Sequence, residues 1–467
     1  MITTMSVAAH PGSAVASRAA GTPWSSGAFL FDAAGAAHLF VVNGSRIYTL
    51  AGEVAAEMEA TINTGEAGAV DTLLVRLGLD APPFVEDVAP TSFRTRAISL
   101  AIAQKCNLGC TYCYAEGGSF GGTQKNMPNR VAIDAVSRLI DEARPGDRVN
   151  VAFLGGEPLT NRTALIATTE FAIARATDRG VQASFSITTN GTLVTPDDGA
   201  FFEHHGFAVT VSIDGIGEDH DRLRPFKGGR GSFARIAERI RPLLAMQRRM
   251  QVSARVTVTP RNLRLRETLD ALVDMGFHSV GFSPMLSSPT GNDEMQRVDL
   301  MAMLGQMVEC GRAFEAHLIA GRRYPFSNMT AAMQEIHKGT HRPYPCGAGG
   351  PYLGVSADGD LFACHRFVGD EAGRMGTVAD GVDATRQQAW LQNRHVHFQD
   401  PCASCWARYL CGGGCHYEVI HRGRPACDYI RGWLHYCLQA YVRLLDARPD
   451  FFAPAAGANS GAAIAAS

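Results

Sequence analysis

The sequence predicts an α/β protein built on a partial (β/α)6 barrel of the TIM type, and three observations support this fold class. Short β-rich runs alternate with longer helical runs between residues 96 and 320. A chain of 467 residues is too long for one ordinary domain. After residue 344 the composition changes to cysteine, glycine and histidine, which predicts a C-terminal domain that metal organises.

A separate N-terminal domain is predicted at residues 27–95, after a disordered start at 1–26. An Asn43-Gly44 pair favours a tight hairpin between two β-rich runs. Apolar residues then recur every four positions, which predicts a helix, and a second short helix follows. The expected elements of this domain are two strands and two helices, at 38–42, 46–50, 54–62 and 70–77.

Six strands separated by helices are predicted for the barrel, at residues 96–320. The strands are expected at 97–103, 149–154, 183–189, 208–213, 252–257 and 279–283. The helices are expected near 129–143, 162–179, 197–204, 232–249 and 264–275. Helical crossovers imply parallel strands with right-handed connections. Because reactive groups in such barrels lie at the C-terminal ends of strands, the loops that follow the strands are predicted to converge on one mouth.

The remaining chain divides into a helical bridge at 321–343, a cysteine-rich domain at 344–440 and a tail at 441–467. The formal net charge of -2 gives no reason to expect nucleic acid or an anionic membrane as a partner. Twelve cysteines at short spacings do not resemble the disulfide framework of a secreted domain, so a reducing compartment is expected. No secretory signal and no apolar stretch long enough to span a bilayer is found, which predicts a cytoplasmic protein.

Three cysteines with the spacing C-x3-C-x2-C follow the first barrel strand: Cys106, Cys110 and Cys113. Cysteine thiolates are the usual ligands of iron-sulfur clusters, and three thiolates leave one iron of a four-iron cluster free. A zinc site is the alternative, but structural zinc sites have four ligands and no nearby histidine completes this one. The motif resembles the signature of the radical S-adenosylmethionine (SAM) enzymes, which have an aromatic residue before the last cysteine, here Tyr112.

The resemblance implies that these cysteines hold a 4Fe-4S cluster whose fourth iron takes SAM, which is cleaved to a 5'-deoxyadenosyl radical. Gly155-Gly156-Glu157 matches the GGE motif of the family, where backbone without side chains approaches the SAM amino group. Three further residues resemble contacts to the SAM carboxylate or ribose: Asn190, Ser212 and Arg224. A loop-stabilising polar role is the alternative for each contact residue. Asp214, which precedes a glycine, is assigned to a turn.

The C-terminal cysteines resemble the SPASM domain found on peptide-modifying radical SAM enzymes, with a zinc ribbon as the alternative. By that resemblance one auxiliary 4Fe-4S cluster has four cysteine ligands, Cys402, Cys405, Cys411 and Cys427. A second auxiliary cluster has three, Cys346, Cys364 and Cys415, for a total of three 4Fe-4S clusters in the chain.

A missing fourth ligand leaves an open coordination site for a substrate thiolate. Cys437 is the competing fourth ligand, although its place on an expected helix favours a buried thiol. Cys310 lies on another expected helix and is assigned to the core.

One residue differs from the pattern expected in sulfatase-maturing relatives. In sulfatase-maturing relatives an Asp base follows the cysteine at position 364, whereas here His365 follows, which argues against formylglycine formation. The runs 364–370 and 375–378 resemble the thioether-forming maturases, which include the quinohemoprotein amine dehydrogenase maturation protein and the SCIFF maturases.

That likeness implies a crosslink from a Cys to a carbon of another residue, an Asp or Glu side chain, in a ribosomal peptide or small protein subunit. Three residues are candidates for a proton acceptor or substrate contact, with a structural role as the alternative: Asp370, Glu116 and His365. Sactionine formation, carbon-carbon crosslinking and epimerisation stay open, as does a non-catalytic Fe-S or zinc protein.

The N-terminal domain resembles the winged-helix-like PqqD-type element that binds the leader of a precursor peptide. An extended leader can add as a strand to the exposed edge of a small sheet. Nine acidic residues against three arginines over 28–95 favour a leader with Lys or Arg. A structural cap on the barrel is the alternative. The expected partners are therefore a cysteine-containing precursor and an electron donor such as flavodoxin or ferredoxin.

Overall fold

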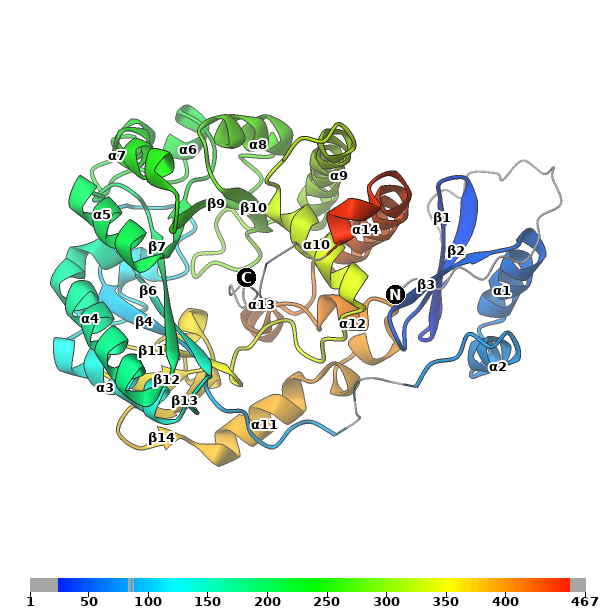
Figure 1. The fold of residues 1–467 in the computed structure, drawn as a ribbon, viewed down its shortest axis with the longest axis horizontal. Coiled ribbons are helices and arrows are strands. Elements are labelled where there is room, and N and C mark those ends of the chain that lie inside the picture. The colour runs from blue at the N-terminus through cyan, green and yellow to red at the C-terminus, as the bar shows by residue number, and fades with distance from the viewer. Residues whose placement is uncertain (1–23, 83–84, 86–87, 454–467) are drawn as a thin grey trace.

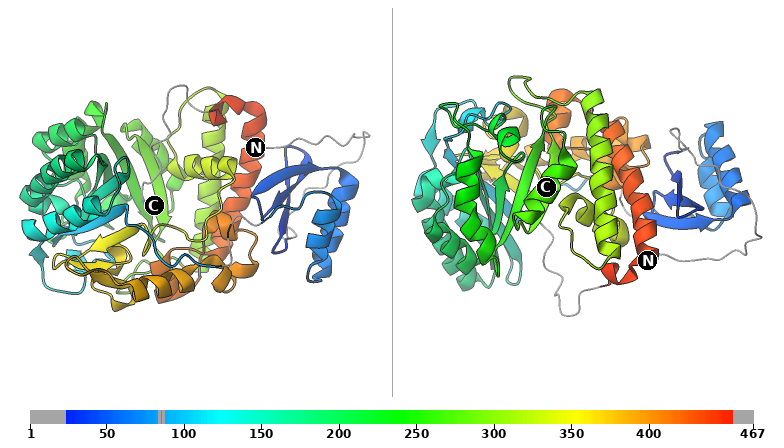
Figure 2. Two further views of the ribbon diagram at one scale, coloured as in Figure 1. Left: turned by 60° about the horizontal axis from the view of Figure 1, so that its bottom comes forward. Right: turned by 90° about the horizontal axis from the view of Figure 1, so that it is seen from above.

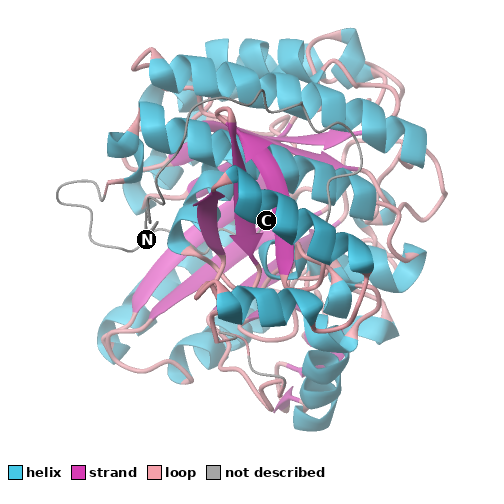
Figure 3. Ribbon diagram, turned by 90° about the vertical axis from the view of Figure 1, so that its right-hand side faces the viewer, coloured by secondary structure: helices cyan, strands magenta, loops and turns pink. Residues whose placement is uncertain are grey.

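The computed structural model describes residues 24–82, 85 and 88–453. Of the start predicted to be disordered, 1–26, residues 1–23 lie outside these ranges. The prediction is wrong for the remainder, because Trp24 forms a bridge with Phe29 and the Ser25 amide donates to the Ala28 carbonyl oxygen at 2.8 Å. Figure 1 shows a barrel of strands and outer helices, a small N-terminal sheet on the opposite side, and C-terminal segments that run along the barrel and between the two. Figure 3 shows the larger sheet enclosed by helices. No helix within the described ranges is long and apolar enough to cross a bilayer.

The N-terminal domain is a three-stranded antiparallel sheet in the order β1-β2-β3, followed by two helices. Its elements are β1 (Ala28–Ala33), β2 (Ala36–Val41), β3 (Arg46–Leu50), α1 (Gly52–Thr64) and α2 (Ala69–Arg76). The predicted hairpin is confirmed, since β2 pairs with β3 and Val41 lies opposite Arg46. Gly44 has a φ of 85°, which a residue without a side chain adopts freely.

Both faces of the N-terminal sheet are covered. Side chains alternate along a strand, so the apolar residues of this sheet point to both faces and need partners on each. Leu30 and Leu39 face α1 and α2 in a small core of their own. Phe29 on the other face stacks on Trp406 with ring centroids 3.9 Å apart. Gln439 of the long C-terminal helix donates to the Asp32 carbonyl oxygen at 2.9 Å. The N-terminal domain is therefore docked on the C-terminal region, on the side away from the barrel (Figure 2).

The barrel has the six predicted parallel strands, in the order β4-β6-β7-β8-β9-β10. They are β4 (Ala97–Gln104), β6 (Arg148–Gly155), β7 (Gln182–Thr189), β8 (Ala208–Ser212), β9 (Gln251–Val258) and β10 (Ser279–Pro284). The five predicted helices are also present, as α3 (Asn129–Asp141), α4 (Arg162–Arg179), α5 (Pro196–His205), α7 (Phe233–Met246) and α8 (Leu265–Asp274). A short α6 (Glu218–Asp221) precedes α7. The partial α/β barrel is confirmed.

The barrel sheet continues beyond β4 into strands that the sequence did not indicate. Parallel pairing joins β4 to β11, and β12, β13 and β14 extend the sheet in antiparallel order. These strands are β11 (Tyr352–Val355), β12 (Asp360–Phe362), β13 (Arg374–Thr377) and β14 (Gly381–Val382), and β5 (Lys125–Asn126) also pairs with β4. Strands this short carry too little periodicity to be recognised. The segment after residue 344 thus shares a sheet with the barrel.

Helices complete the C-terminal region. They are α9 (Arg297–Ile319), α10 (Ser327–Lys338), α11 (Ala384–Arg394), α12 (Arg408–Cys411), α13 (His416–Arg422) and α14 (Cys427–Ala447). The boundary predicted at residue 440 falls inside α14, where Tyr441 and Leu444 are buried. The first part of the predicted tail is therefore helical, because its apolar residues continue the buried face of that helix.

Candidate cluster and cofactor sites

The loop after β4 brings the Cys106, Cys110 and Cys113 thiols together. All three side chains are partly exposed. Burial raises the pKa of Cys110 to about 12; Arg224 opposes that rise, and the two other thiols add to it. These interactions indicate that the three thiols lie close together on one short loop. Such an arrangement suits a cluster in which each thiolate binds a different iron. These residues could hold the predicted 4Fe-4S cluster.

Gly155 and Gly156 allow the end of β6 to cross the start of this loop. A Cβ on Gly155 would lie 2.3 Å from the Ala103 carbonyl oxygen, and one on Gly156 would lie 2.3 Å from the Lys105 carbonyl oxygen. The Gly156 amide donates to the Ala103 oxygen at 2.8 Å. The two glycines are thus required by packing against the cysteine loop, and their contact with SAM stays a prediction.

Glu157 is fully buried, and both of its carboxylate oxygens accept hydrogen bonds from the protein. The donors are the Asn190 amide at 2.7 Å, the Thr189 hydroxyl at 2.8 Å and the Leu159 amide at 3.0 Å. Burial raises the pKa of Glu157 although these donors lower it. The side chain thus joins the loops after β6 and β7, and the contact of this residue with the cofactor stays a prediction.

Asn190 is also turned toward the cysteine loop. Its amide nitrogen lies 3.7 Å from the Cys106 sulfur and donates to Asn107 Oδ1 at 2.9 Å. Its oxygen accepts from the Thr192 hydroxyl at 2.6 Å. Ser212 lies at the end of β8, partly exposed, opposite Arg255 of β9. Contacts of Asn190 and Ser212 with SAM stay predictions, but Asn190 already supports the cluster loop.

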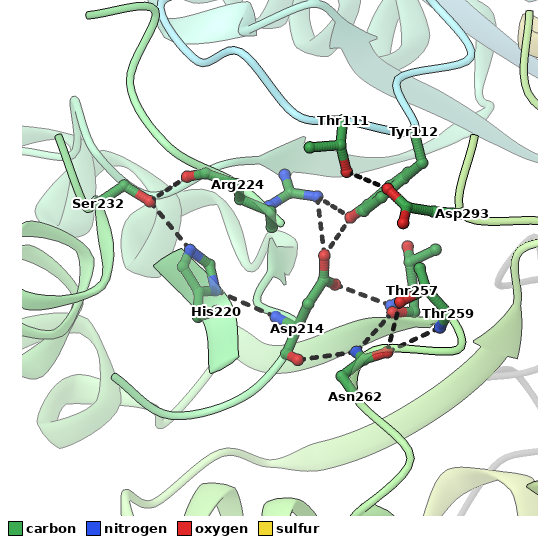
Figure 4. Close-up of polar contacts among 10 residues, drawn as sticks. All are labelled: Thr111, Tyr112, Asp214, His220, Arg224, Ser232, Thr257, Thr259, Asn262 and Asp293. Atoms are coloured by element: carbon green, nitrogen blue, oxygen red, sulfur yellow. Dashed lines mark hydrogen bonds and ion pairs between the residues drawn. The ribbon is translucent and has the colours of Figure 1, made fainter. Parts of the chain in front are cut away.

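The predicted turn role of Asp214 is wrong, because its carboxylate is the buried centre of the network in Figure 4. One oxygen accepts the Thr257 amide at 2.8 Å, and the other accepts the Tyr112 hydroxyl and lies 3.6 Å from Arg224 Nη1. Arg224 also donates to the Tyr112 hydroxyl at 2.7 Å. The contacts link segments that are distant in sequence, so no local pattern signals them.

This network adds a structural role to the ones predicted for Tyr112 and Arg224. Arg224 Nη1 lies 3.6 Å from the Asp214 carboxylate, whereas the buried Arg224 Nε has no hydrogen-bond partner among the described residues, so the predicted contact with the SAM carboxylate stays a prediction. Arg224 also lowers the pKa of Cys106 and Cys110 against the effect of burial, so its charge acts on the cluster loop. The Tyr112 hydroxyl is enclosed between the same two partners, which holds the loop against β8 and β9.

His220 supports the network through the backbone of Asp214. The Asp214 amide donates to His220 Nδ1 at 3.1 Å, and Nε2 lies 3.0 Å from the Ser232 hydroxyl (Figure 4). Burial, followed by the charge of Arg224, lowers the pKa of His220 to about 3. A neutral imidazole therefore fixes the Asp214 backbone.

Four C-terminal cysteines form the group predicted for one auxiliary cluster. They line a cavity together with Cys415 of the other predicted group, and the four are Cys402, Cys405, Cys411 and Cys427. Burial raises the pKa of Cys402 to about 11, and the charges of the three other members add to the rise against Arg424. Cysteine sulfurs around an otherwise mainly apolar cavity fit an iron-sulfur cluster.

Cys346, Cys364 and Cys415 form a second group. Burial raises the pKa of Cys364 to about 12, and the charges of Cys415 and Cys346 contribute next. Cys415 also raises the pKa of Cys346, which burial brings to about 11. The structure therefore brings together the three thiols that were predicted to share a cluster.

Cys437 lies apart from both groups. It is fully buried in α14, and its pKa is raised by burial and by the charge of Glu315. Its other electrostatic partners are Tyr429 and Tyr436, not the thiols of the second group. Cys310 is fully buried, as predicted. Cys437 is thus a core thiol between α9 and α14, and the second group keeps three cysteines.

No group of three or more His, Cys, Asp or Glu side chains within the described ranges is arranged to hold a single metal ion. A four-iron cluster makes a different demand, because its thiolates bind separate irons. The two C-terminal groups and the loop after β4 suit that demand in number and in chemistry.

Comparison with known proteins agrees with this arrangement. The model of the radical SAM superfamily matches residues 100–249, the part of the barrel that carries the cysteine loop. The chain is a radical SAM enzyme. A serine-type anaerobic sulfatase-maturating enzyme from Klebsiella aerogenes is 27% identical over 344 residues, which cover 71% of this chain and 82% of the relative. A cysteine-type enzyme from Clostridium novyi is 32% identical over 148 residues, 30% of this chain and 38% of the relative.

The fold of this radical SAM enzyme is also similar to that of a solved structure. The structure described as native anSMEcpe with bound AdoMet aligns with a TM-score of 0.62 at 18% identity. The alignment covers 75% of this chain and 99% of that chain. At this identity the likeness concerns the fold alone.

The candidate catalytic residues of this radical SAM enzyme have different surroundings. His365 Nδ1 lies 2.9 Å from the Tyr352 hydroxyl, and burial, Arg366 and Arg255 lower the pKa of His365 to about 4. Asp370 accepts from His421 Nε2 at 2.7 Å and from the Ala372 amide at 2.9 Å, which is a structural role. The His365 side chain therefore remains as a neutral group beside Cys364. Asp370 caps the short turn at 371–373, and its role as a proton acceptor stays a prediction.

Glu116 is exposed on a short turn with a φ of 48°. It lies within electrostatic reach of Tyr417, as Asp370 does. Two of the three candidates thus gather at one tyrosine that the sequence did not single out. Their roles as proton acceptors stay predictions.

Aromatic and arginine side chains occupy the region between the two cysteine regions, and sequence reasoning missed them. The Arg366 guanidinium lies over the Tyr417 ring at 4.3 Å and the Tyr114 ring at 5.3 Å. Arg366 is also paired with Glu418. Tyr114 interacts with the thiols of both Cys113 and Cys364. This ring therefore lies between the cysteine loop of the barrel and the second C-terminal group.

Proposed function

We propose that this radical SAM enzyme joins a Cys thiol to a carbon of another residue, an Asp or Glu side chain, in a ribosomal peptide or small protein subunit. One observation carries the proposal. The second cysteine group has three thiols, Cys437 lies elsewhere, and Tyr114 connects this group to the cysteine loop of the barrel. A group with one ligand fewer than irons suits an enzyme whose substrate brings a thiolate of its own.

Three 4Fe-4S clusters complete the proposed enzyme. The first is assigned to the loop after β4, with Cys106, Cys110 and Cys113. The second and third are assigned to the C-terminal groups, with Cys402, Cys405, Cys411 and Cys427 in one and Cys346, Cys364 and Cys415 in the other. All twelve cysteines lie within the described residues as free thiols, which supports a reducing compartment such as the cytoplasm.

The overall reaction removes two hydrogens from the peptide and forms one C–S bond. When bound, SAM and the cluster held by Cys106, Cys110 and Cys113 would supply a 5'-deoxyadenosyl radical that takes the carbon-bound hydrogen atom and becomes 5'-deoxyadenosine. The thiol would lose its proton to a base, and a cluster held by the C-terminal cysteines would take the one surplus electron. That electron would balance the one consumed in cleaving SAM, so no oxidant other than SAM would be required.

The protein holds these groups in place. Asn190, Glu157 and the network of Asp214 position the cysteine loop, and the neutral His365 beside Cys364 is the proposed proton acceptor or substrate contact. The outer edge of β3 in the N-terminal sheet is proposed as the PqqD-type site where the precursor leader adds as a strand. An electron donor such as flavodoxin or ferredoxin is proposed to reduce the first cluster.

A second candidate is oxidation of a sulfatase residue, as the names of the curated relatives state for those proteins. The match to the Klebsiella aerogenes enzyme over 71% of this chain favours it. His365 stands against it, because this position follows Cys364 where the sulfatase-maturing relatives are expected to have an Asp base.

One experiment separates the two functions. Reconstituted, reduced enzyme is incubated with SAM and a cysteine-containing candidate precursor, and the peptide mass, alkylatable thiols and hydrazide-reactive aldehydes are measured. A thioether predicts the loss of two hydrogens and of one alkylatable thiol, with no aldehyde, and fragmentation locates the carbon. An unchanged mass with a retained thiol contradicts the thioether for that precursor, and an aldehyde supports the second candidate.

A further inference from the structure

Arg255 lies on the inner face of the barrel, close to the second cysteine group. Residues 252, 254, 256 and 258 of β9 are buried against the helices, and Arg255 alternates with them on the opposite face of the strand. Its charge interacts with the Cys415 thiol and with Arg366, and it lowers the pKa of His365. The side chain therefore extends from the barrel toward the C-terminal groups.

The Arg255 guanidinium has no hydrogen-bond acceptor or carboxylate partner among the described residues. Other partly buried arginines have one. Four of these are paired with carboxylates: Arg162 with Asp198, Arg224 with Asp214, Arg366 with Glu418 and Arg443 with Glu315. Burial lowers the pKa of Arg255, an effect that Cys415 opposes and Arg366 reinforces. An enclosed cation without an anion is costly, so the site is suited to an anionic ligand.

The position of Arg255 indicates which anion it serves. Arg224, rather than Arg255, interacts with the Cys106 and Cys110 thiols where SAM is predicted to bind. The interactions of Arg255 are with Cys415, Arg366 and His365, all from the C-terminal region. Glu418 is paired with Arg366 through one oxygen, and no carboxylate among the described residues forms an ion pair with Arg255.

We infer that Arg255 binds the side-chain carboxylate of the peptide residue whose carbon is crosslinked. The inference rests on the proposed function and assigns its substrate an acidic residue. Guanidinium binds carboxylates through paired hydrogen bonds, and such bonds inside a protein are stronger than those between neutral groups. Arg255 would hold the Asp or Glu beside the second cysteine group and orient the carbon toward the barrel mouth. Compensation of cluster charge is the competing role.

Two thiol probes that differ only in charge test this inference on the reconstituted enzyme: 3-mercaptopropionate and its neutral amide, 3-mercaptopropanamide. Saturating SAM occupies the first cluster, and each thiol is titrated while the optical and EPR spectra of the auxiliary clusters are recorded. Wild-type enzyme is expected to bind the carboxylate probe about tenfold more tightly, which is the effect of one charge-assisted hydrogen bond. Arg255→Gln is expected to abolish this preference.

A matched control is Arg148→Gln, at the opposite end of the barrel, where the arginine is exposed and donates to Gln182 at 2.8 Å. This variant is expected to keep the preference. Iron content is measured for every variant. If Arg255→Gln loses its iron, Arg255→Lys serves instead, because lysine keeps the charge without the paired donors. Its preference is expected to fall about threefold, and an undiminished preference overturns the inference.

The outcomes test the carboxylate site separately from the proposed thioether formation. Equal affinities for the two probes in wild-type enzyme overturn the carboxylate site and leave the thioether proposal in place. A preference that Arg255→Gln retains likewise overturns it in favour of charge compensation. If neither thiol changes the spectra of the auxiliary clusters, the proposed binding of a substrate thiol is contradicted. The carboxylate site, which rests on that proposal, is then contradicted as well.

Discussion

The two cysteine regions of this enzyme are organised in different ways. The first is a single loop, from Cys106 to Cys113. Its Tyr112 hydroxyl donates to the buried Asp214 carboxylate, which follows β8 and accepts the Thr257 amide of β9. The second runs from Cys346 to Cys427 and draws its thiols from loops, short helices and the start of the long helix α14. The first region is therefore fixed by the barrel, whereas the second depends on contacts that bring distant segments together.

The largest expected effects separate the two regions by task. Cys106→Ala should reduce 5'-deoxyadenosine formation by more than the roughly 100-fold that loss of an outer-shell partner costs, because it removes a predicted ligand of the SAM-binding cluster. Cys364→Ala should leave 5'-deoxyadenosine formation largely intact and abolish the thioether. Chromatography of nucleoside products together with peptide mass measures both. Equal loss of both products in the two variants would contradict the division of labour.

The next effect concerns the barrel alone. Asp214→Asn leaves the Arg224 charge buried without its partner, which should lower the free energy of unfolding by about 3–5 kcal/mol. Denaturant unfolding measures this. Asp141→Asn is the matched control, since it removes a partly exposed partner of Arg175 and should cost less than about 1 kcal/mol. A similar small cost for both variants would mean that the network does not hold the loop.

The sequence was sufficient for the regular parts of the molecule and for the cysteine groups. The six barrel strands follow from alternating apolar runs, and the Cys106 loop is recognisable from local spacing. The division of the C-terminal cysteines into two groups came from resemblance. Their spacing did not indicate it, because strands too short to recognise in the sequence, such as β11, bring Cys364 near Cys346. Asp214, Tyr114 and Arg255 gave no local signal, since their partners come from other segments of the chain.

Stability should also depend on pH through the support of the first region. His220 has a pKa of about 3 in the folded protein, below the ordinary value of 6.5. Between these values the unfolded state binds more protons, so stability falls as pH falls through that window, by at most ~1.4 kcal/mol per pH unit. Denaturant unfolding of wild type and His220→Asn at pH 7 and pH 5 measures the contribution. Identical pH slopes in the two proteins would contradict it.

The smallest effect is expected at the cysteine outside the groups. Cys437→Ala should leave the iron content and the thioether unchanged, because this thiol is packed between α9 and α14. Iron and sulfide analysis, with Cys364→Ala as the comparison, checks this. Loss of iron from Cys437→Ala would make it the fourth ligand of the second group and close the proposed opening.

The most direct test of the division between the regions is an iron count on a variant without the first one. Cys106→Ala/Cys110→Ala/Cys113→Ala is reconstituted, and its iron and sulfide are measured together with its Mössbauer spectrum. Two auxiliary clusters predict about eight iron atoms per chain, falling to about four when Cys346→Ala and Cys364→Ala are added. About four irons in the triple variant, or zinc in place of iron, would contradict the account.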